Sequence, residues 1–323
     1  MIVDNIKSDQ PFAERYLVVD EFMPEGEAAA MRAAIEAHFA DPARHMPATH
    51  MVWNYWYVPG LYTYLRADPD KVLGTKLARA FYDRLAGWSR ETLGLSEVTW
   101  TCLSLYIPGC RQAQHNDSAN GRFGFVYSLT RNDRKTEGGE TLIWREDDYF
   151  TTRLQQPYAA PGFYDAIVPR FNRLLVFDDR VPHAVQRVEG GMNPSEGRIV
   201  LHGHLREAGP IVEGALPADQ VGEIVGDMAA SFADELGPAC ELLHGLVVVR
   251  FIVARNGTVS GLRVVLNRLK RLAGEGPALD DVLGRLLKRV SELAFPAART
   301  TTQIALPIGF GDDLVSNFAA VSR

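Results

Sequence analysis

The feature that most constrains this chain is a set of polar residues that only a folded sheet can bring together: His115 and Asp117, then Pro182-His183, then Arg198. Successive side chains on a β-strand point to opposite faces, so His115 and Asp117 can aim at one point. His183 can complete a three-ligand set. Two imidazoles and one carboxylate leave half of an octahedron open, which is what non-haem Fe(II) needs when O₂ and an organic co-substrate must both bind.

The residues around this set predict short strands separated by turns, preceded by two amphipathic helices. The helices are expected over 25–39 and 70–93, and the strands over 98–107, 123–129, 141–144, 173–177 and 198–205. Helices ahead of a run of strands, with ligands near strand ends, indicate an α+β fold in which helices buttress a jelly-roll-type β-sandwich.

Two features beside the first helix leave simpler interpretations open. His38 adjoins the apolar stripe of that helix and is expected to be a partly exposed surface histidine. Residues 41–60 break the periodicity with three prolines and a cluster of tryptophans and tyrosines. Such a segment forms either a lid or wall of a substrate pocket, or a cover over the core.

Several motifs in the strand region together carry a family resemblance. Two motifs follow His115-x-Asp117: Phe125-Val126-Tyr127-Ser128-Leu129-Thr130 and then Gly138-Gly139-Glu140-Thr141-Leu142. After them come Pro182-His183 and Gly197-Arg198-Ile199-Val200-Leu201, and the order and spacing of all these motifs match those of one family. Over about 12–207 the chain resembles the prolyl-4-hydroxylase-like branch of the Fe(II)/2-oxoglutarate-dependent oxygenases. The resemblance implies a double-stranded β-helix (jelly-roll) core.

The same resemblance assigns roles to five residues. It implies that His115, Asp117 and His183 are the iron ligands and that Arg198 pairs with the distal carboxylate of 2-oxoglutarate. A planar guanidinium suits that task because it makes two parallel charge-assisted hydrogen bonds. Tyr106 matches a tyrosine that family members often place near the same carboxylate. The predicted catalytic residues are therefore His115, Asp117, His183 and Arg198, with Arg198 and Tyr106 binding the co-substrate.

Other polar residues lie close to these in the sequence. His202 and His204 share strand parity with Arg198 and could reach the pocket. Arg187 is an alternative to Arg198 as the basic residue that binds the carboxylate. It lies only four residues after His183, which is too early in the sequence for the strand that returns under the site. Asp178 and Asp179 are expected in a turn and not as iron ligands.

The activity that the resemblance implies is a dioxygenase that hydroxylates an unactivated C–H of a peptidyl or free amino-acid-type substrate, using O₂ and releasing succinate and CO₂. Ascorbate is a candidate reductant. Asp117 favours hydroxylation over halogenation, because halogenating relatives have a small residue there. Two alternatives stay open: an enzyme of the same class that desaturates, epimerises or cyclises, and a non-catalytic scaffold that binds a metal or ligand and recruits a partner.

The chain after residue 209 has a different pattern. It predicts a helix over 218–236, then a strand (246–254), an Asn256-Gly257 turn, a strand (259–266), a helix (279–293) and a strand (301–310). This ββαβ order resembles the C-terminal domain of TonB-type proteins over 241–310. We expect an oxygenase domain (1–209), a linker and connecting helix (210–240) and a TonB-like domain (241–323).

The TonB-like domain lacks the surroundings that such domains need to transmit energy across an envelope. We find no transmembrane anchor and no proline-rich spacer, so energy transduction is not expected. An exposed edge strand could instead bind an extended peptide by strand addition. Packing or dimerisation with a second copy of the chain is the alternative.

Composition narrows the remaining choices. With 323 residues, 46% of them hydrophobic, the chain can bury two cores. The net charge of the chain is −6. From Gly237 onward, eleven basic and seven acidic residues give a charge of +4, so residues 1–236 carry a charge of −10. The absence of a dense basic stripe argues against a nucleic-acid partner. Three cysteines without a CxxC pair argue against disulfides, and the start lacks a signal-peptide pattern, so we expect a cytoplasmic protein without a membrane partner.

Overall fold

The computed structural model describes residues 11–41, 52–145, 162–272 and 276–311. They form two compact units, and each is described by itself. The first takes in 15–85 and 98–205, and the second takes in 11–14, 86–97 and the described residues from 206 onward. Helices and strands in both units give the predicted α+β class. Within the described ranges, no helix combines the length and the apolar character needed to cross a bilayer.

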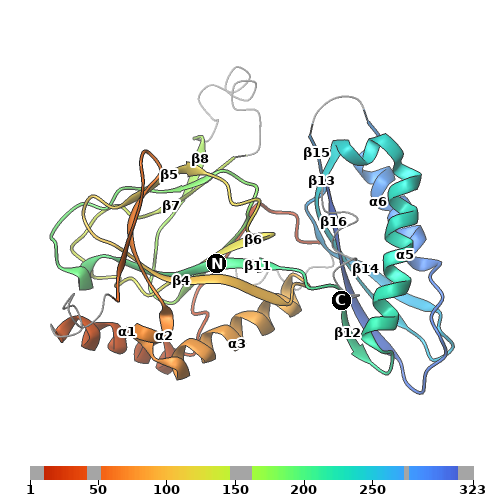
Figure 1. Ribbon diagram of the computed structural model, residues 1–323, viewed down its shortest axis with the longest axis horizontal. Coiled ribbons are helices and arrows are strands. Elements are labelled where there is room, and N and C mark those ends of the chain that lie inside the picture. The colour runs from red at the N-terminus through yellow and green to blue at the C-terminus, as the bar shows by residue number, and fades with distance from the viewer. Residues whose placement is uncertain (1–10, 42–51, 146–161, 273–275, 312–323) are drawn as a thin grey trace. The chain divides into compact units, whose positions relative to one another are not determined.

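The first unit is built on a curled 11-stranded sheet (Figure 1). Its strand order is β1-β9-β6-β11-β4-β3-β5-β10-β7-β8, with β2 paired to β3. Neighbouring strands such as β6 and β11, and β5 and β10, run antiparallel. The strands are β1 (Tyr16–Val19), β2 (Asn54–Val58), β3 (Tyr62–Ala67), β4 (Glu97–Tyr106), β5 (Arg111–His115), β6 (Phe123–Ser128), β7 (Thr141–Trp144), β8 (Tyr164–Ile167), β9 (Arg173–Asp178), β10 (His183–Val185) and β11 (Arg198–Arg206).

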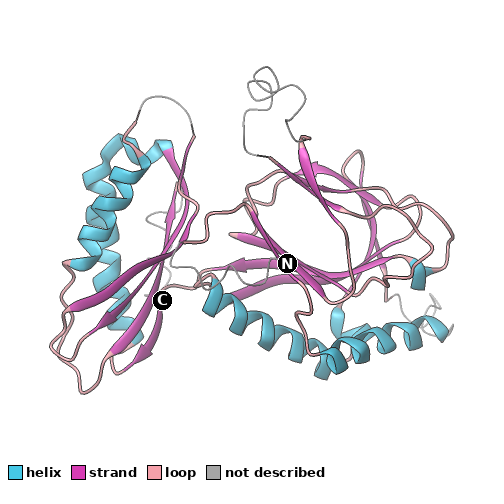
Figure 2. Ribbon diagram, turned by 180° about the vertical axis from the view of Figure 1, so that it is seen from behind, coloured by secondary structure: helices cyan, strands magenta, loops and turns pink. Residues whose placement is uncertain are grey.

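Helices lie along one side of this sheet (Figures 1 and 2). α1 (Glu25–Ala40) begins after Pro24 and buries Met31 and Ile35, as its apolar spacing predicts. The second predicted helix is divided into α2 (Pro69–Leu73) and α3 (Thr75–Thr92), because Gly74 adopts a φ of +80° that no α-helix contains. Phe81 of α3 packs on Tyr127 of β6, with ring centroids 4.9 Å apart.

The aromatic segment forms a hairpin that the sequence did not predict. β2 and β3 pair from Asn54↔Arg66 to Val58↔Tyr62, while residues 42–51 lie outside the described residues. Both interpretations of the segment hold in part. Trp53 stacks on Phe39, and its indole N–H donates to Nε2 of His38 at 3.1 Å, whereas Trp56 faces a cavity. The expectation for His38 was wrong: its exposure is 0%, because the Trp53 ring covers it.

The second unit is a 5-stranded sheet of order β12-β16-β13-β14, with β15 paired to β13. α5 and α6 cover one face (Figure 2) and share an apolar core with β13 and β16. The predicted hairpin at Asn256-Gly257 joins β13 to β14. The elements are β12 (Ile211–Gly214), α5 (Ala218–Leu236), β13 (Leu243–Val253), β14 (Val259–Asn267), β15 (Lys270–Arg271), α6 (Leu279–Ser291) and β16 (Thr302–Phe310).

The segment 210–240, expected as a linker and connecting helix, contributes to this second unit. β12 pairs with β16, from Ile211↔Ala305 to Gly214↔Thr302. Val225 and Phe232 of α5 are buried in the same apolar core as Phe251 of β13. A helix with one continuous apolar stripe needs such a surface to cover it.

Candidate active site

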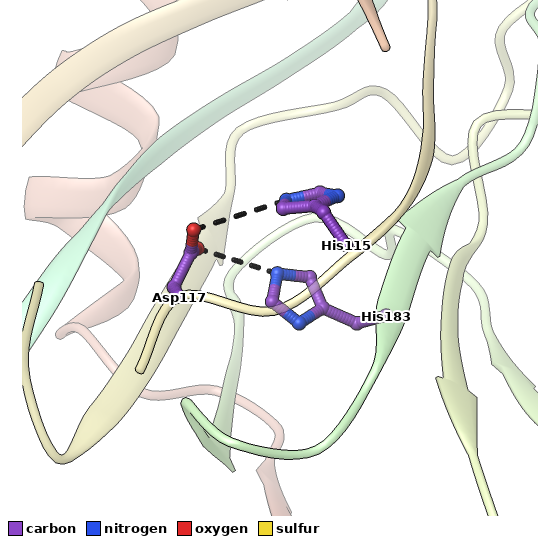
Figure 3. Close-up of side chains that lie close together, drawn as sticks. All are labelled: His115, Asp117 and His183. Carbon is purple, nitrogen blue, oxygen red and sulfur yellow. Dashed lines mark ion pairs between the residues drawn. The ribbon is translucent and has the colours of Figure 1, made fainter. Parts of the chain in front are cut away.

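The three predicted ligands converge at the paired ends of β5 and β10. His115 ends β5 and is the direct cross-strand partner of His183, which begins β10, so their imidazole centroids lie 4.3 Å apart. Asp117 lies just beyond β5, where its backbone N–H donates to the carbonyl oxygen of Asp179 at 2.8 Å. Its carboxylate oxygens lie 3.3 Å from Nε2 of His183 and 4.0 Å from Nε2 of His115 (Figure 3).

Backbone carbonyl groups fix the orientation of both imidazoles. Nδ1 of His115 lies 2.7 Å from the carbonyl oxygen of Ala113, and Nδ1 of His183 lies 3.0 Å from that of Val181. Because a carbonyl oxygen can only accept, each Nδ1 carries the proton and each Nε2 presents a lone pair. Both lone pairs are then available on the side where the Asp117 carboxylate lies, as metal ligation requires.

The electrostatics of Asp117 and His115 favour the protonation states that bind a metal. Burial alone would raise the pKa of Asp117, but the neighbouring imidazoles, that of His183 first and then that of His115, lower it to about 2. Burial and the neighbouring His183 lower the pKa of His115. A carboxylate and neutral imidazoles are the forms that ligate metals.

These residues fit the metal implied by their chemistry. One ligand atom from each of the three lies within 4.8 Å of the others, close enough for a single ion. Two imidazole nitrogens and one carboxylate oxygen, with open positions, make the donor set of non-haem Fe(II) sites.

Arg198 provides a second binding feature in the same cavity. Its exposure is 1%, and its Nε and Nη1 have no hydrogen-bond partner within the described part of the chain. Nη2 lies 3.2 Å from the hydroxyl oxygen of Thr141. At Gly139, whose φ is +78°, a Cβ would approach Cδ of Arg198 to 3.0 Å, so glycine leaves room for the arginine stem. A buried guanidinium with two unsatisfied donors fits an incoming carboxylate.

Tyr106 lies against that guanidinium. The Arg198 Cζ atom lies 4.6 Å from the centroid of the Tyr106 ring, which in turn stacks on Tyr64 at 4.9 Å. Burial raises the pKa of Tyr106, so the phenol keeps its proton and can donate a hydrogen bond. The structure thus brings Tyr106 and Arg198 together at one end of the cavity.

The other polar residues have clear positions. Arg187, the rival of Arg198, is 58% exposed and pairs with Glu189. His202 and His204 line the cavity, as strand parity predicted. Nδ1 of His204 lies 3.0 Å from the Asp179 carboxylate, and burial raises the pKa of Asp179 to about 6.

Asp179 is a neighbour of the site that sequence reasoning placed only in a turn. It follows β9, is fully buried, and groups with Asp117 and His204 as a second set of possible ligands. Its one sequence signal was the run Asp178-Asp179-Arg180 close before His183. Thr141, beside Arg198, was also missed as a pocket residue, although it belongs to the motif that carries the resemblance.

The cavity joins these features. It has a volume of about 250 Å³ and is lined by the three predicted ligands, by Tyr106 and Arg198, and by aromatic side chains of β2, β3 and β4. Pockets for small molecules usually measure about 300–1,000 Å³. This cavity is therefore suited to a compact ligand.

Comparison with known proteins supports an oxygenase. Residues 102–206 match the 2OG-Fe(II) oxygenase superfamily, whose members use Fe(II) and 2-oxoglutarate. The matched segment contains His115, Asp117, His183 and Arg198. The chain therefore contains an oxidoreductase segment of the iron- and 2-oxoglutarate-dependent dioxygenase type.

The chain aligns in part with several solved structures, whereas no curated protein sequence matches. A prolyl-4-hydroxylase from Pseudomonas putida is 19% identical, with a TM-score of 0.44, covering 64% of this chain and 97% of its own. A Trichoplax adhaerens prolyl hydroxylase, solved with a hypoxia inducible factor peptide fragment, is 16% identical, with a TM-score of 0.43, covering 64% and 88%. The epimerase SnoN from nogalamycin biosynthesis is 16% identical, with a TM-score of 0.44, covering 61% and 77%.

Proposed function

We propose that the protein is an Fe(II)- and 2-oxoglutarate-dependent hydroxylase that acts on an unactivated C–H of an amino-acid-type substrate. One observation carries the proposal: the His115, Asp117 and His183 ligand set and the unsatisfied guanidinium of Arg198 line the same cavity. A metal site alone would leave the buried arginine unexplained.

The residues of the cavity have separate roles in this activity. His115, Asp117 and His183 would hold the metal, and the carbonyl groups of Ala113 and Val181 keep both imidazoles in the ligating tautomer. When bound, Fe(II) and 2-oxoglutarate supply an oxidant derived from O₂, with succinate and CO₂ as products. The chain contributes the position of each partner.

Arg198, Tyr106 and Thr141 are proposed to bind the distal carboxylate of 2-oxoglutarate. Arg198 supplies two donors that no described residue accepts, and Tyr106 keeps a phenolic proton. In a buried site, charge-assisted hydrogen bonds of this kind are shorter and stronger than neutral ones. They would hold the co-substrate in the cavity that the three metal ligands also line.

The proposal is tested by measuring succinate formed from 2-oxoglutarate by the iron-loaded protein in air, with and without ascorbate as reductant. We expect turnover in the wild type and in His244→Ala, a histidine of the second unit, and none in His183→Ala. Equal succinate formation by all three would contradict the proposal. Mass analysis of the product then separates hydroxylation from desaturation, epimerisation and cyclisation.

For the second unit we propose peptide binding at the edge of its sheet. β14 pairs with β13 alone over most of its length, and the backbone of Phe12 covers only its end at Val265 and Asn267. Along 259–264 the outer edge of β14 has no partner strand among the described residues, so it could accept an added strand. Shifts of the backbone amide signals of 259–264 on adding an extended peptide would support this role, and unchanged signals would favour packing or dimerisation.

A further inference from the structure

A second guanidinium, that of Arg66, faces the cavity and pairs with no carboxylate of the described residues. β3 alternates Tyr62, Tyr64 and Arg66 on the face that lines the cavity. Arg66 is the cross-strand partner of Ser104, as Leu65 is of Leu105. The side chain is therefore held by the sheet itself and not by a loop.

The contacts of Arg66 do not neutralise its charge. Its Nη2 donates to Sγ of Cys102 at 2.6 Å, and its guanidinium lies over the Trp56 ring at 4.7 Å. No carboxylate lies within ion-pair distance of it in the ranges that the structure describes. Arg15 and Arg173 of the same unit, by contrast, pair with Asp165 and Asp20.

The neighbouring histidine adds a polar group but no charge. Nε2 of His202 is buried and has no hydrogen-bond partner in the described chain. Burial, and then the charges of Arg66 and Arg198, lower the pKa of His202 to about 3, so its imidazole is neutral near pH 7. A ligand beside Arg66 would find a neutral imidazole nitrogen within the same cavity.

With Fe(II) and 2-oxoglutarate bound, the charges in the cavity would leave one positive charge without a negative partner. Asp117 is the one carboxylate among the described lining residues, against the guanidiniums of Arg66 and Arg198. The two positive charges of Fe(II) and that of Arg198 balance Asp117 and the two carboxylates of 2-oxoglutarate. His204 and Asp179 lie 3.0 Å apart and form a pair of their own, apart from Arg66. Arg66 remains as the surplus positive charge, and a partly buried cation without an anion is unfavourable.

The mouth of the cavity adds flat apolar surface. Trp56 is 43% exposed and Trp100 is 70% exposed, and both line the cavity. Trp100 also has a φ of +55°, a conformation that bulky residues rarely adopt and that is often kept for function. Two exposed indoles favour contact with a ring.

We infer, resting on the proposed function, that the substrate is a small ring-bearing acid whose free carboxylate is bound by Arg66 while its ring contacts Trp56 and Trp100. A substrate of this class is a free molecule and not a residue within a peptide. A residue inside a peptide has no free main-chain carboxylate to offer Arg66, whereas a free amino acid or another small acid does.

The test compares ring acids with their carboxamides: L-proline with L-prolinamide, indole-3-acetate with indole-3-acetamide, and benzoate with benzamide. Binding is measured by calorimetry on protein saturated with Fe(II) and 2-oxoglutarate without oxygen, so that Arg198 is already occupied. We expect at least one acid to bind ~tenfold or more tightly than its amide, a difference of about 1.4 kcal/mol.

Three variants assign that preference to its residue. Arg66→Met keeps a similar length but should bind acid and amide equally, and Arg66→Lys should retain part of the preference. Arg79→Met, at an exposed arginine that pairs with Asp83, should behave as the wild type. If no acid binds, if each amide binds as tightly as its acid, or if Arg66→Met keeps the preference, the inference is overturned.

The visible absorption of the iron and 2-oxoglutarate complex, recorded in the same samples, keeps the two proposals apart. Absorption present with no acid preference overturns only the substrate class. Absorption absent in the wild type overturns the proposed function itself, whatever the acids do.

Discussion

The two units differ in how many polar groups they bury. The first buries Arg198, His183, Asp179 and His204 between its strands, whereas the second buries mainly apolar side chains and fewer polar ones, such as Arg268, whose Nη1 donates to the carbonyl oxygen of Ala13. Both sets of possible metal ligands found among the described residues lie in the first unit. Because burying polar groups is unfavourable unless they are paired, their concentration in the first unit is typical of a functional site there.

The largest expected difference between the two units follows from the substitution of a metal ligand. His183→Ala removes one of three ligands, and we expect iron affinity to fall by more than ~100-fold, since even residues behind a ligand can contribute 10–100-fold. His244→Ala, in the second unit, is the matched control. Iron content after dialysis measures the effect, and iron retained equally by both variants would show that the metal is held elsewhere.

A core substitution in the second unit should show the opposite behaviour. Phe232→Ala leaves a cavity between α5 and the sheet and should destabilise that unit by about 3–5 kcal/mol. Iron binding should not change. Denaturant unfolding monitored beside iron binding tests this, and a parallel loss of iron would mean that the two interiors are coupled.

Arg198 separates co-substrate binding from metal binding within the first unit. Arg198→Met should weaken 2-oxoglutarate binding by about 1.5–3 kcal/mol, because charge-assisted hydrogen bonds are lost, and Arg198→Lys by less. Iron affinity without 2-oxoglutarate should stay at the wild-type level. Calorimetric titration distinguishes these cases, and unchanged 2-oxoglutarate affinity would remove Arg198 from the site.

His202 predicts a pH effect that belongs to the first unit. Its pKa is about 3 in the folded state and 6.5 in the reference state, so the unfolded chain takes up the proton first. The contribution of the neutral imidazole to stability is therefore present above pH 6.5 and is lost as the pH falls toward 3. His202→Gln should show a smaller fall in unfolding free energy between about pH 7 and about pH 4 than the wild type. An identical pH profile would show that His202 is not buried in its neutral form.

The smallest expected effect concerns strain at the mouth of the cavity. Trp100→Gly relieves a φ of +55° and should stabilise the first unit by about 1 kcal/mol, after the entropy of glycine is counted. Binding of the ring acids should weaken at the same time. Thermal unfolding and calorimetry together test this, and a destabilised variant would mean that Trp100 serves packing.

Local patterns predicted much of this architecture. α5 has the predicted bounds of 218–236, because one apolar stripe and Gly237 define it completely. β7 likewise matches 141–144. The convergence of His115, Asp117 and His183 followed from their motifs, although Asp117 lies beyond the strand end, in the turn held by Asp179.

What the sequence did not predict depends on contacts between distant segments. The β2–β3 hairpin was hidden because aromatic residues occupy both faces of β2. His38 is buried only because Trp53 folds over it, and Asp179 gains its partner only when β11 passes beside it. Arg66 gave no local signal at all, since a cavity shared by several strands cannot be read from one of them.

The most direct test of the iron and 2-oxoglutarate site is an anaerobic titration of the metal-free protein with Fe(II) and 2-oxoglutarate, followed by visible absorption. The account predicts a weak charge-transfer band that is absent in His183→Ala and that needs far more 2-oxoglutarate in Arg198→Ala. A well-folded, iron-loaded wild type without that band would contradict the account and favour a non-catalytic binding scaffold.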